Sequence, residues 1–108
     1  MKQCNNETIL IIDTSNSQET IVGLKINGKK HFLKGSSKIL KAQNVLPLIE
    51  KIIKKHCLKP KDLTAIRVNT GPGSFTGLRV GMAVANALAW ALKIPVNGKK
   101  QVEPKYGT

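Results

Sequence analysis

The sequence predicts an α/β domain in which helices cover a mixed, five-stranded sheet. Three observations predict this class: a continuous apolar run at residues 8–14, an alternating run at residues 19–26 that ends in Asn27-Gly28, and a later helical pattern between short apolar runs. The expected order is β-β-β-α-β-α-β. With 108 residues and 41% apolar residues, the chain can form one core. We expect a single domain at residues 1–98 and a flexible basic tail at residues 99–108.

The first three strands are predicted from their residue patterns. Residues 8–14 read Thr-Ile-Leu-Ile-Ile-Asp-Thr, which is typical of a central strand covered on both faces. Residues 19–26 alternate as a second strand, and Asn27-Gly28 predicts a type I′ turn, because both central positions of that turn need positive φ. Residues 30–35 return as an edge strand whose lysines oppose pairing with another molecule.

Two helices and two further strands complete the expected order. Apolar residues at helical spacing predict a helix at residues 38–57, in which Pro47 indicates a kink or a late start. A fourth strand at residues 64–69 follows this crossover and is expected to be parallel to the first. A second helix is predicted at residues 75–93, and Ile94-Pro95-Val96 begins a fifth strand.

The second helix is apolar on almost every side, since Asn86 is the only strongly polar residue between positions 80 and 92. One face can cover the sheet, and the other face needs a further cover. Small residues at i, i+4 spacing form a seam that lets another helix approach closely, beside Trp90 as an anchor. The alternative is a helix buried within its own domain. The predicted partner interface consists of Val45, Ile49, Gly77, Gly81, Met82, Ala85, Ala89 and Trp90.

A glycine-rich loop precedes this helix, and such a loop can cradle phosphate through backbone N–H groups. It lacks the Lys-Ser/Thr pair and the G-x-G-x-x-G spacing of known phosphate motifs, and Pro72 removes one donor. The alternative is a strand-to-helix turn capped by Ser74 or Thr76. Asp13 ends the first strand, where it either orients a ligand or accepts backbone N–H groups in the following turn. The candidate vestigial nucleotide site is Asp13, Thr14, Ser15, Gly71, Gly73 and Ser74.

The formal charge of +12 raises nucleic acid as a partner, although only two of the 18 basic residues are arginine. The lysines that would contact RNA are Lys29, Lys30, Lys34, Lys54, Lys55 and Lys59. Cys4 and Cys57 match no metal or disulfide spacing, and neither His31 nor His56 has a catalytic partner suggested by spacing. We therefore expect no catalytic residue and no metal site. The longest apolar stretch is shorter than the ~20 residues that span a bilayer, which predicts a soluble, cytoplasmic protein.

Three segments resemble the TsaB family, also called YeaZ, which acts in the biosynthesis of threonylcarbamoyladenosine on tRNA. They are Ile-Ile-Asp-Thr-Ser at residues 11–15, Leu-Pro-Leu-Ile at residues 46–49 and Gly-Pro-Gly-Ser-Phe-Thr-Gly-Leu-Arg-Val-Gly at residues 71–81. The resemblance extends from residue 8 to about residue 98. It implies half of an actin / sugar-kinase / heat-shock-ATPase (ASKHA) fold, which is ribonuclease H-like and has a five-stranded mixed sheet.

The resemblance also implies a function. Members of the family act as a scaffold for the catalytic subunit TsaD, pair with it through helices of the first domain, and have TsaE as a further ATPase partner. The chain itself is expected to bind no cofactor, while ATP and a metal are expected in the partner subunit; a homodimer and tRNA contact in the complex also fit. The chain departs from the family at Lys41, where a histidine is frequent, and in lacking the second actin-like half. The alternatives are a residual actin-like ATPase and a basic tRNA-binding module.

Overall fold

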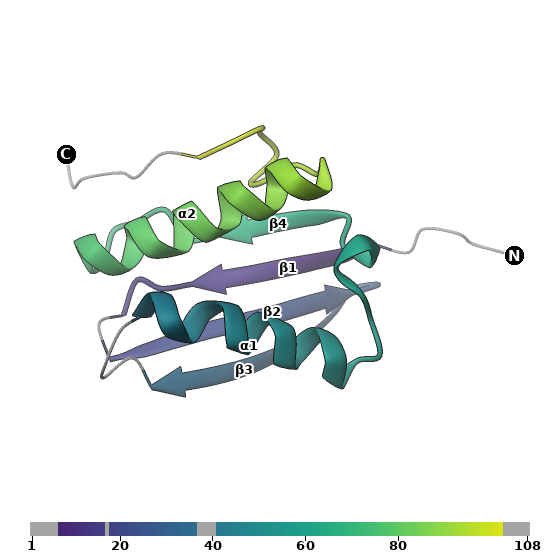
Figure 1. Ribbon diagram of the computed structural model, residues 1–108, viewed down its shortest axis with the longest axis horizontal. Helices are drawn as coiled ribbons and strands as arrows, with labels where there is room; N and C mark the ends of the chain where they lie inside the picture. The colour runs from purple at the N-terminus through teal and green to yellow at the C-terminus, as the bar shows by residue number, and fades with distance from the viewer. Residues whose placement is uncertain (1–6, 17, 37–40, 103–108) are drawn as a thin grey trace, which may run out of the picture.

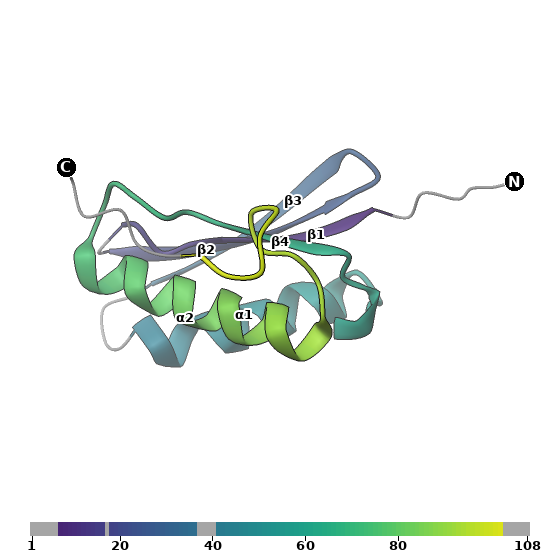
Figure 2. The ribbon, with the colours of Figure 1, turned by 90° about the horizontal axis from the view of Figure 1, so that it is seen from above.

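The computed structural model describes residues 7–16, 18–36 and 41–102, which form a sheet covered on one face by two helices (Figures 1 and 2). The strands are β1 (Thr8–Asp13), β2 (Glu19–Ile26), β3 (Lys29–Ser36) and β4 (Ala65–Val68). The helices are α1 (Lys41–Lys55), the short 3₁₀ helix η1 (Pro60–Asp62) and α2 (Phe75–Leu92). Residues 37–40, with which the first helix was predicted to begin, lie outside the described residues.

The sheet has the order β3-β2-β1-β4 and is mixed, as predicted. β2 is antiparallel to both β1 and β3, whereas β4 is parallel to β1, as the helical crossover requires. The prediction of five strands is corrected by the structure, because the described residues contain four strands. Val96 forms only an isolated parallel bridge with Ile66.

The fifth strand is cut short because the chain reverses directly after Val96. Asn97 has φ 51° and Gly98 has φ 76°, and Val96 then bridges Lys99 in the antiparallel sense. The Asn97 side chain accepts from the Val68 N–H and donates to the Val68 carbonyl, each at 2.9 Å. This amide therefore bonds to β4 in place of the backbone of a neighbouring strand.

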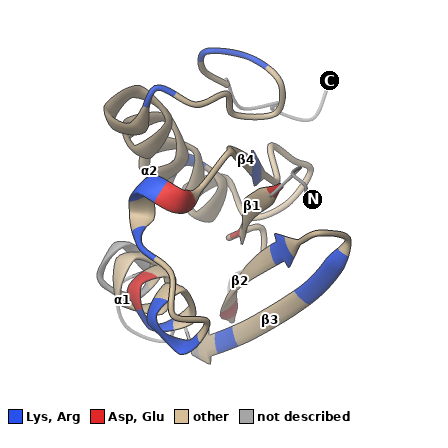
Figure 3. Ribbon diagram, turned by 90° about the vertical axis from the view of Figure 1, so that its right-hand side faces the viewer, with Lys and Arg blue, Asp and Glu red and all other residues tan. Residues whose placement is uncertain are grey.

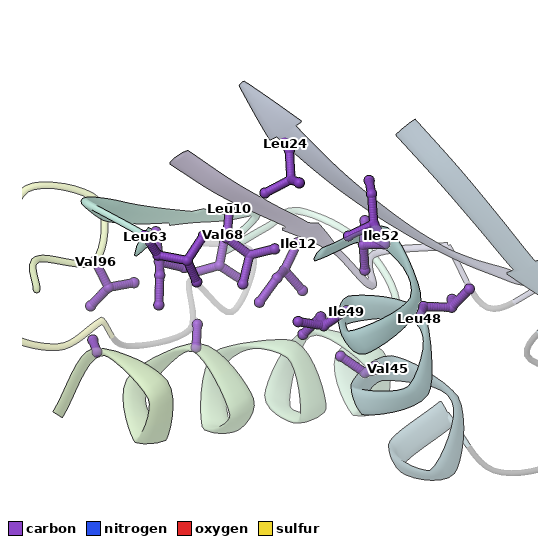
Figure 4. Packing of buried hydrophobic residues seen from close by; sticks show 14 of the residues in the cluster. Leu10, Ile12, Leu24, Val45, Leu48, Ile49, Ile52, Leu63, Val68 and Val96 are labelled. Carbon is purple, nitrogen blue, oxygen red and sulfur yellow. The ribbon is translucent and has the colours of Figure 1, made fainter. Parts of the chain in front are cut away.

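The core lies between the sheet and the two helices (Figure 4). Alternate side chains of each strand point toward the helices, as the period of two requires. The buried strand residues include Leu10, Ile12, Val22, Leu24, Ile66 and Val68, and the helices contribute Val45, Ile49, Ile52, Leu78, Met82, Ala85 and Ala89. Pro47 lies within α1, so the helix continues through this residue. Pro47 is also exposed.

The edge strand β3 is attached to the end of α1 by two histidines. The rings of His31 and His56 have centroids 4.5 Å apart, and His56 Nδ1 lies 3.0 Å from the Ile52 carbonyl oxygen. A carbonyl is only an acceptor, so Nδ1 carries the proton in this bond. This contact fixes the position of the β2–β3 hairpin relative to α1.

Val102, which lies in the range expected to form the tail, is hydrogen-bonded to α2. The Asn86 side chain donates to the Val102 carbonyl at 3.1 Å and accepts from the Val102 N–H at 2.9 Å. Residues 99–102 are therefore bonded to the domain, and residues 103–108 lie outside the described residues.

By length and composition alone α2 could cross a membrane, a property it shares with core helices of soluble proteins; 33% of it is buried against this chain.

The turn between β2 and β3 confirms the hairpin prediction, because Asn27 has φ 50° and Gly28 has φ 90°.

We expect Gly28→Val to lower the free energy of unfolding by about 1–3 kcal/mol, since a β-branched residue is strained at positive φ. Chemical denaturation measures this loss. No atom lies within 4 Å of an added Cβ, so the loss comes from the backbone and not from a clash. Gly28→Asn is the control and should cost much less, since asparagine tolerates this region. Equal stability of the valine variant and the wild type would contradict the turn assignment.

Candidate functional site

The loops after β1 and β4 meet because adjacent parallel strands end at the same edge of the sheet. The Ser74 N–H donates to the Ser15 carbonyl at 2.7 Å, and the Asn69 N–H donates to the Ile12 carbonyl at 3.0 Å. A Cβ at Gly73 would lie 2.6 Å from the Ser15 Cβ. The structure thus brings together the residues predicted as a vestigial nucleotide site: Asp13, Thr14, Ser15, Gly71, Gly73 and Ser74.

The Asp13 carboxylate accepts hydrogen bonds from neighbouring residues of the two loops. Its Oδ1 accepts from the Ser15 N–H at 3.0 Å, the Ser15 hydroxyl at 2.6 Å and the Asn69 amide at 3.3 Å. The turn alternative for Asp13 therefore describes its role: it holds two loops together. Asn69 was not predicted from the sequence as a residue of this site. It could have been identified as a polar residue directly after a strand that is parallel to β1.

The glycine-rich loop uses two of its N–H groups, which a phosphate cradle would need, to bond to the protein itself. The Gly71 N–H donates to Asn69 Oδ1 at 2.9 Å, and the Ser74 N–H is bonded to Ser15. Ser74 is the N-cap of α2, since its hydroxyl accepts from the Gly77 N–H at 3.3 Å. Pro72 has no N–H. These bonds favour the strand-to-helix turn over a phosphate site.

Thr14 fixes the start of α2 against β1. Its buried hydroxyl donates to the Gly77 carbonyl at 2.5 Å. Gly81 lies one turn further along α2, and any Cβ there would overlap Thr14 Oγ1. Glycine at position 81 is thus required by close packing against the loop after β1, and the small residues of α2 have their partner within this chain.

Most of the predicted partner interface is buried inside the chain. Exposed fractions are 5% or less for the core side chains of that set, and both glycines are buried. The set comprises Val45, Ile49, Gly77, Gly81, Met82, Ala85 and Ala89. Trp90 differs from them, because 83% of it is exposed. A surface for a partner must therefore use neighbouring residues that α1 and α2 expose.

Such a surface exists between the helices. A hollow of about 550 Å³, which we call the interhelix groove, lies between α1, η1 and α2. Leu46 is 52% exposed on one wall, and Leu88 and Leu58 are half-buried on the others. The apolar lining consists of Leu46, Ile49, Ile53, Leu58, Leu63 and Leu88, with Pro47 and Pro60 at the rim. The groove could not be predicted from the sequence, because the segment between α1 and β4 that lines one side of it has no periodic pattern.

The lysines proposed for tRNA contact gather mostly at one end of the molecule. Figure 3 looks onto this end, where the β2–β3 hairpin, the end of α1 and the connector to β4 all carry basic residues. Lys29, Lys30, Lys54, Lys55 and Lys59 lie there, while Lys34 lies further along β3. Lys54 also pairs with Glu50 at 3.6 Å, and both side chains are exposed, so this pair adds little stability.

Metal chemistry has no support in the described part of the chain, where no group of three or more His, Cys, Asp or Glu could hold an ion. Cys57 is a free, exposed thiol. Cys4 and the side chain of Lys41 lie outside what the structure describes.

The sheet order, the two helices on one face and the joined loops at the carboxyl ends of β1 and β4 define half of an actin-like, ASKHA-type domain. The solved structure of YeaZ from Pseudomonas aeruginosa superposes with a TM-score of 0.76 at 33% identity, covering 83% of this chain and 41% of that one. Residues 39–103 match the family described as TsaD: tRNA N6-adenosine threonylcarbamoyltransferase. The chain belongs to the TsaB family.

Two relatives carry this assignment. The tRNA threonylcarbamoyladenosine biosynthesis protein TsaB of Bacillus subtilis is 33% identical over 104 residues, which cover 89% of this chain and 42% of that protein. The protein of the same name from Haemophilus influenzae is 34% identical over 91 residues, which cover 84% and 38%. The chain thus spans about two-fifths of the length of these relatives.

The Thr14–Gly81 contact predicts a specific coupling. We expect Gly81→Ala to lower the free energy of unfolding by about 1–3 kcal/mol, because the new methyl group displaces the Thr14 hydroxyl. Thr14→Ala alone should also destabilise, since it removes the buried hydroxyl and its hydrogen bond to the Gly77 carbonyl. The double variant should lose less than the sum of the two single losses, because each substitution disturbs the same contact. Additive losses in chemical denaturation would show that Gly81 does not pack on Thr14.

Proposed function

We propose that this chain is a non-catalytic subunit in tRNA threonylcarbamoyladenosine biosynthesis and binds a TsaD-type catalytic partner through the outer faces of α1 and α2. Its membership of the TsaB family supports the pathway, since the relatives carry that name. The pairing with TsaD, the further partner TsaE and the cytoplasmic location belong to the proposal. So does the expectation that ATP and a metal are bound in the partner subunit.

The interhelix groove is the observation that carries this proposal. Most of its lining is leucine, isoleucine and proline, with Glu50, Lys54 and Lys59 as its charged residues, and Leu46 exposes about half of its surface to water. The outer face of α2 continues the apolar surface with Val84 and Leu88 half-buried and Ala87 exposed. Exposed apolar surface of this kind marks a site for another protein. A helix laid into the groove would cover it, as amphipathic partners do.

A non-catalytic role is supported by the loops at the carboxyl ends of β1 and β4. Asp13 Oδ1 accepts three hydrogen bonds from the chain itself, and the Gly71 and Ser74 N–H groups are already donated to protein acceptors. A nucleotide would have to break these bonds to bind. The residual ATPase is therefore the less favoured candidate.

We expect the purified chain to hydrolyse no ATP, because these groups are used to hold its loops. A phosphate-release assay on the wild type and on Asp13→Asn and Asp13→Ala measures this. Both variants should match the background rate, while Asp13→Ala alone loses stability because it removes the acceptor of three bonds. Turnover that persists through purification and disappears in Asp13→Ala would contradict the non-catalytic role.

The groove predicts where a substitution should abolish partner binding. Leu46→Asp should weaken the affinity for the TsaD-type protein of the same organism roughly tenfold to hundredfold, because it buries an unpaired carboxylate in an apolar contact. The melting temperature should barely change, since Leu46 is half exposed in the free chain. Isothermal titration calorimetry and size-exclusion chromatography measure heterodimer and homodimer formation on the same samples.

Gln18→Asp is the matched control for this experiment. It adds the same carboxylate at an exposed position in the loop after β1, away from the groove. Its affinity should equal that of the wild type. If Leu46→Asp binds the partner as tightly as Gln18→Asp does, the groove is not the interface.

A further inference from the structure

A second hollow, of about 720 Å³, lies at the carboxyl end of α2 and is separate from the interhelix groove. Its walls come from the last turns of α2 and from residues 94–100. Three lysines line it, namely Lys93, Lys99 and Lys100, and none of the described residues that line it is a carboxylate. The remaining lining is apolar and small, with Ala89, Ala91 and Pro95 around Trp90. This combination suits an anionic ligand with a flat apolar part.

Trp90 is the most exposed large apolar residue that the structure describes there. It is 83% exposed, and it is the single tryptophan of the chain. Its neighbours on the wall of the hollow, Ala89 and Ala91, are too small to cover the indole. The indole is thus available to stack against another ring, and such stacking on a nucleobase does not depend on base identity.

The backbone around the hollow is fixed by hydrogen bonds. The Val96 N–H donates to the Lys99 carbonyl at 2.7 Å, and the Lys99 N–H donates back at 2.9 Å. Asn97 is bonded to β4 through its side chain, and Val96 is fully buried. Lys93 ends α2 in the left-handed conformation with φ 57°, and its N–H is bonded to the Ala89 carbonyl. A ligand would therefore meet lysines on an ordered backbone.

The hollow belongs to the basic end of the molecule. Figure 3 shows basic residues on the loop beyond α2 as well as on the hairpin, α1 and the connector, so several elements at this end carry positive charge. Lys59 lies in the connector between α1 and η1, and Lys29 and Lys30 lie at the hairpin. Asp62 is an acidic residue in the same connector. The excess of positive charge attracts a polyanion and gives its backbone a path away from Trp90.

We propose that the carboxyl end of α2 is a binding site for single-stranded RNA. An unpaired base stacks on Trp90 in the hollow, and Lys93, Lys99 and Lys100 contact the flanking phosphates. An acidic peptide supplies a ring only where it carries an aromatic residue, whereas every nucleotide of RNA carries both a phosphate and a base, so RNA fits both features. The site is separate from the interhelix groove, which carries the proposed contact with TsaD, and the two are tested with different variants.

The single tryptophan makes the test direct. Titrating the chain with a short single-stranded RNA, such as a fluorescently labelled uridine 10-mer, should quench the Trp90 emission as the base stacks. Trp90→Ala should lower the affinity about tenfold by anisotropy, whereas Trp90→Phe, which keeps an aromatic face, should lose much less. Trp90 is almost fully exposed, so circular dichroism should show both variants folded.

The lysines are tested by the salt dependence of binding. Lys99→Gln with Lys100→Gln should flatten the slope of log K against log salt by about 1.4, since each phosphate contact on a single strand contributes ~0.7. The control pair, Lys25→Gln with Arg67→Gln, removes the same charge from the sheet and should leave tryptophan quenching unchanged. The Leu46→Asp variant should bind the RNA normally.

Three outcomes would overturn the proposal. RNA that binds without changing the tryptophan emission would place the contact elsewhere on the basic end. An equal response to poly-glutamate would indicate an acidic protein partner in place of RNA. Affinity unchanged in Trp90→Ala would show that no base stacks there. Loss of RNA binding in Trp90→Ala with intact partner binding would support this site and leave the proposed function untouched.

Discussion

The buried contact between Thr14 and the first turns of α2 is the constraint on which the rest of the structure depends. The Thr14 hydroxyl donates to the Gly77 carbonyl, and Gly81 leaves room for the same side chain one turn later. Close approach of helix and strand ends places α2 directly on β1 and β4. The opposite side of α2 is then left to face outward, although its residues are mostly apolar. The exposed apolar surface of α2 is thus a consequence of packing at the loops.

The same packing explains why the loops are poor candidates for catalysis. In a doubly wound sheet the carboxyl ends of parallel strands are the usual place for a ligand. Here Asp13, Asn69 and Ser15 bond to one another, and the Ser74 N–H joins them. The polar groups at this edge therefore stabilise the loops that position α2. The two surfaces that remain available, the interhelix groove and the basic end with Trp90, both lie elsewhere.

Much of the fold could be predicted from the sequence, because its strongest signals are local. The apolar run of β1, the Asn27-Gly28 turn and the helical spacing in α1 each specify their own element. The prediction of a fifth strand was wrong because the Asn97 side-chain amide bonds to Val68 where a strand would pair. No periodic pattern in the sequence indicates this side-chain bonding. The small residues of α2 were predicted to form a seam where another helix packs, either the first helix or a helix of a partner chain. The structure places Thr14 against Gly81, a contact 67 positions apart in sequence that helical spacing cannot reveal.

The central claim is that the outer face of α1 and α2 is covered by a TsaD-type protein. Hydroxyl-radical footprinting of the chain, free and in the presence of that partner, tests it most directly. Leu46 and Leu88 in the groove should become protected, whereas Phe32, which is 51% exposed and lies over Gly23 on the sheet face away from the helices, should react equally in both samples. Protection of Phe32 with unchanged reaction at Leu46 and Leu88 would contradict the account.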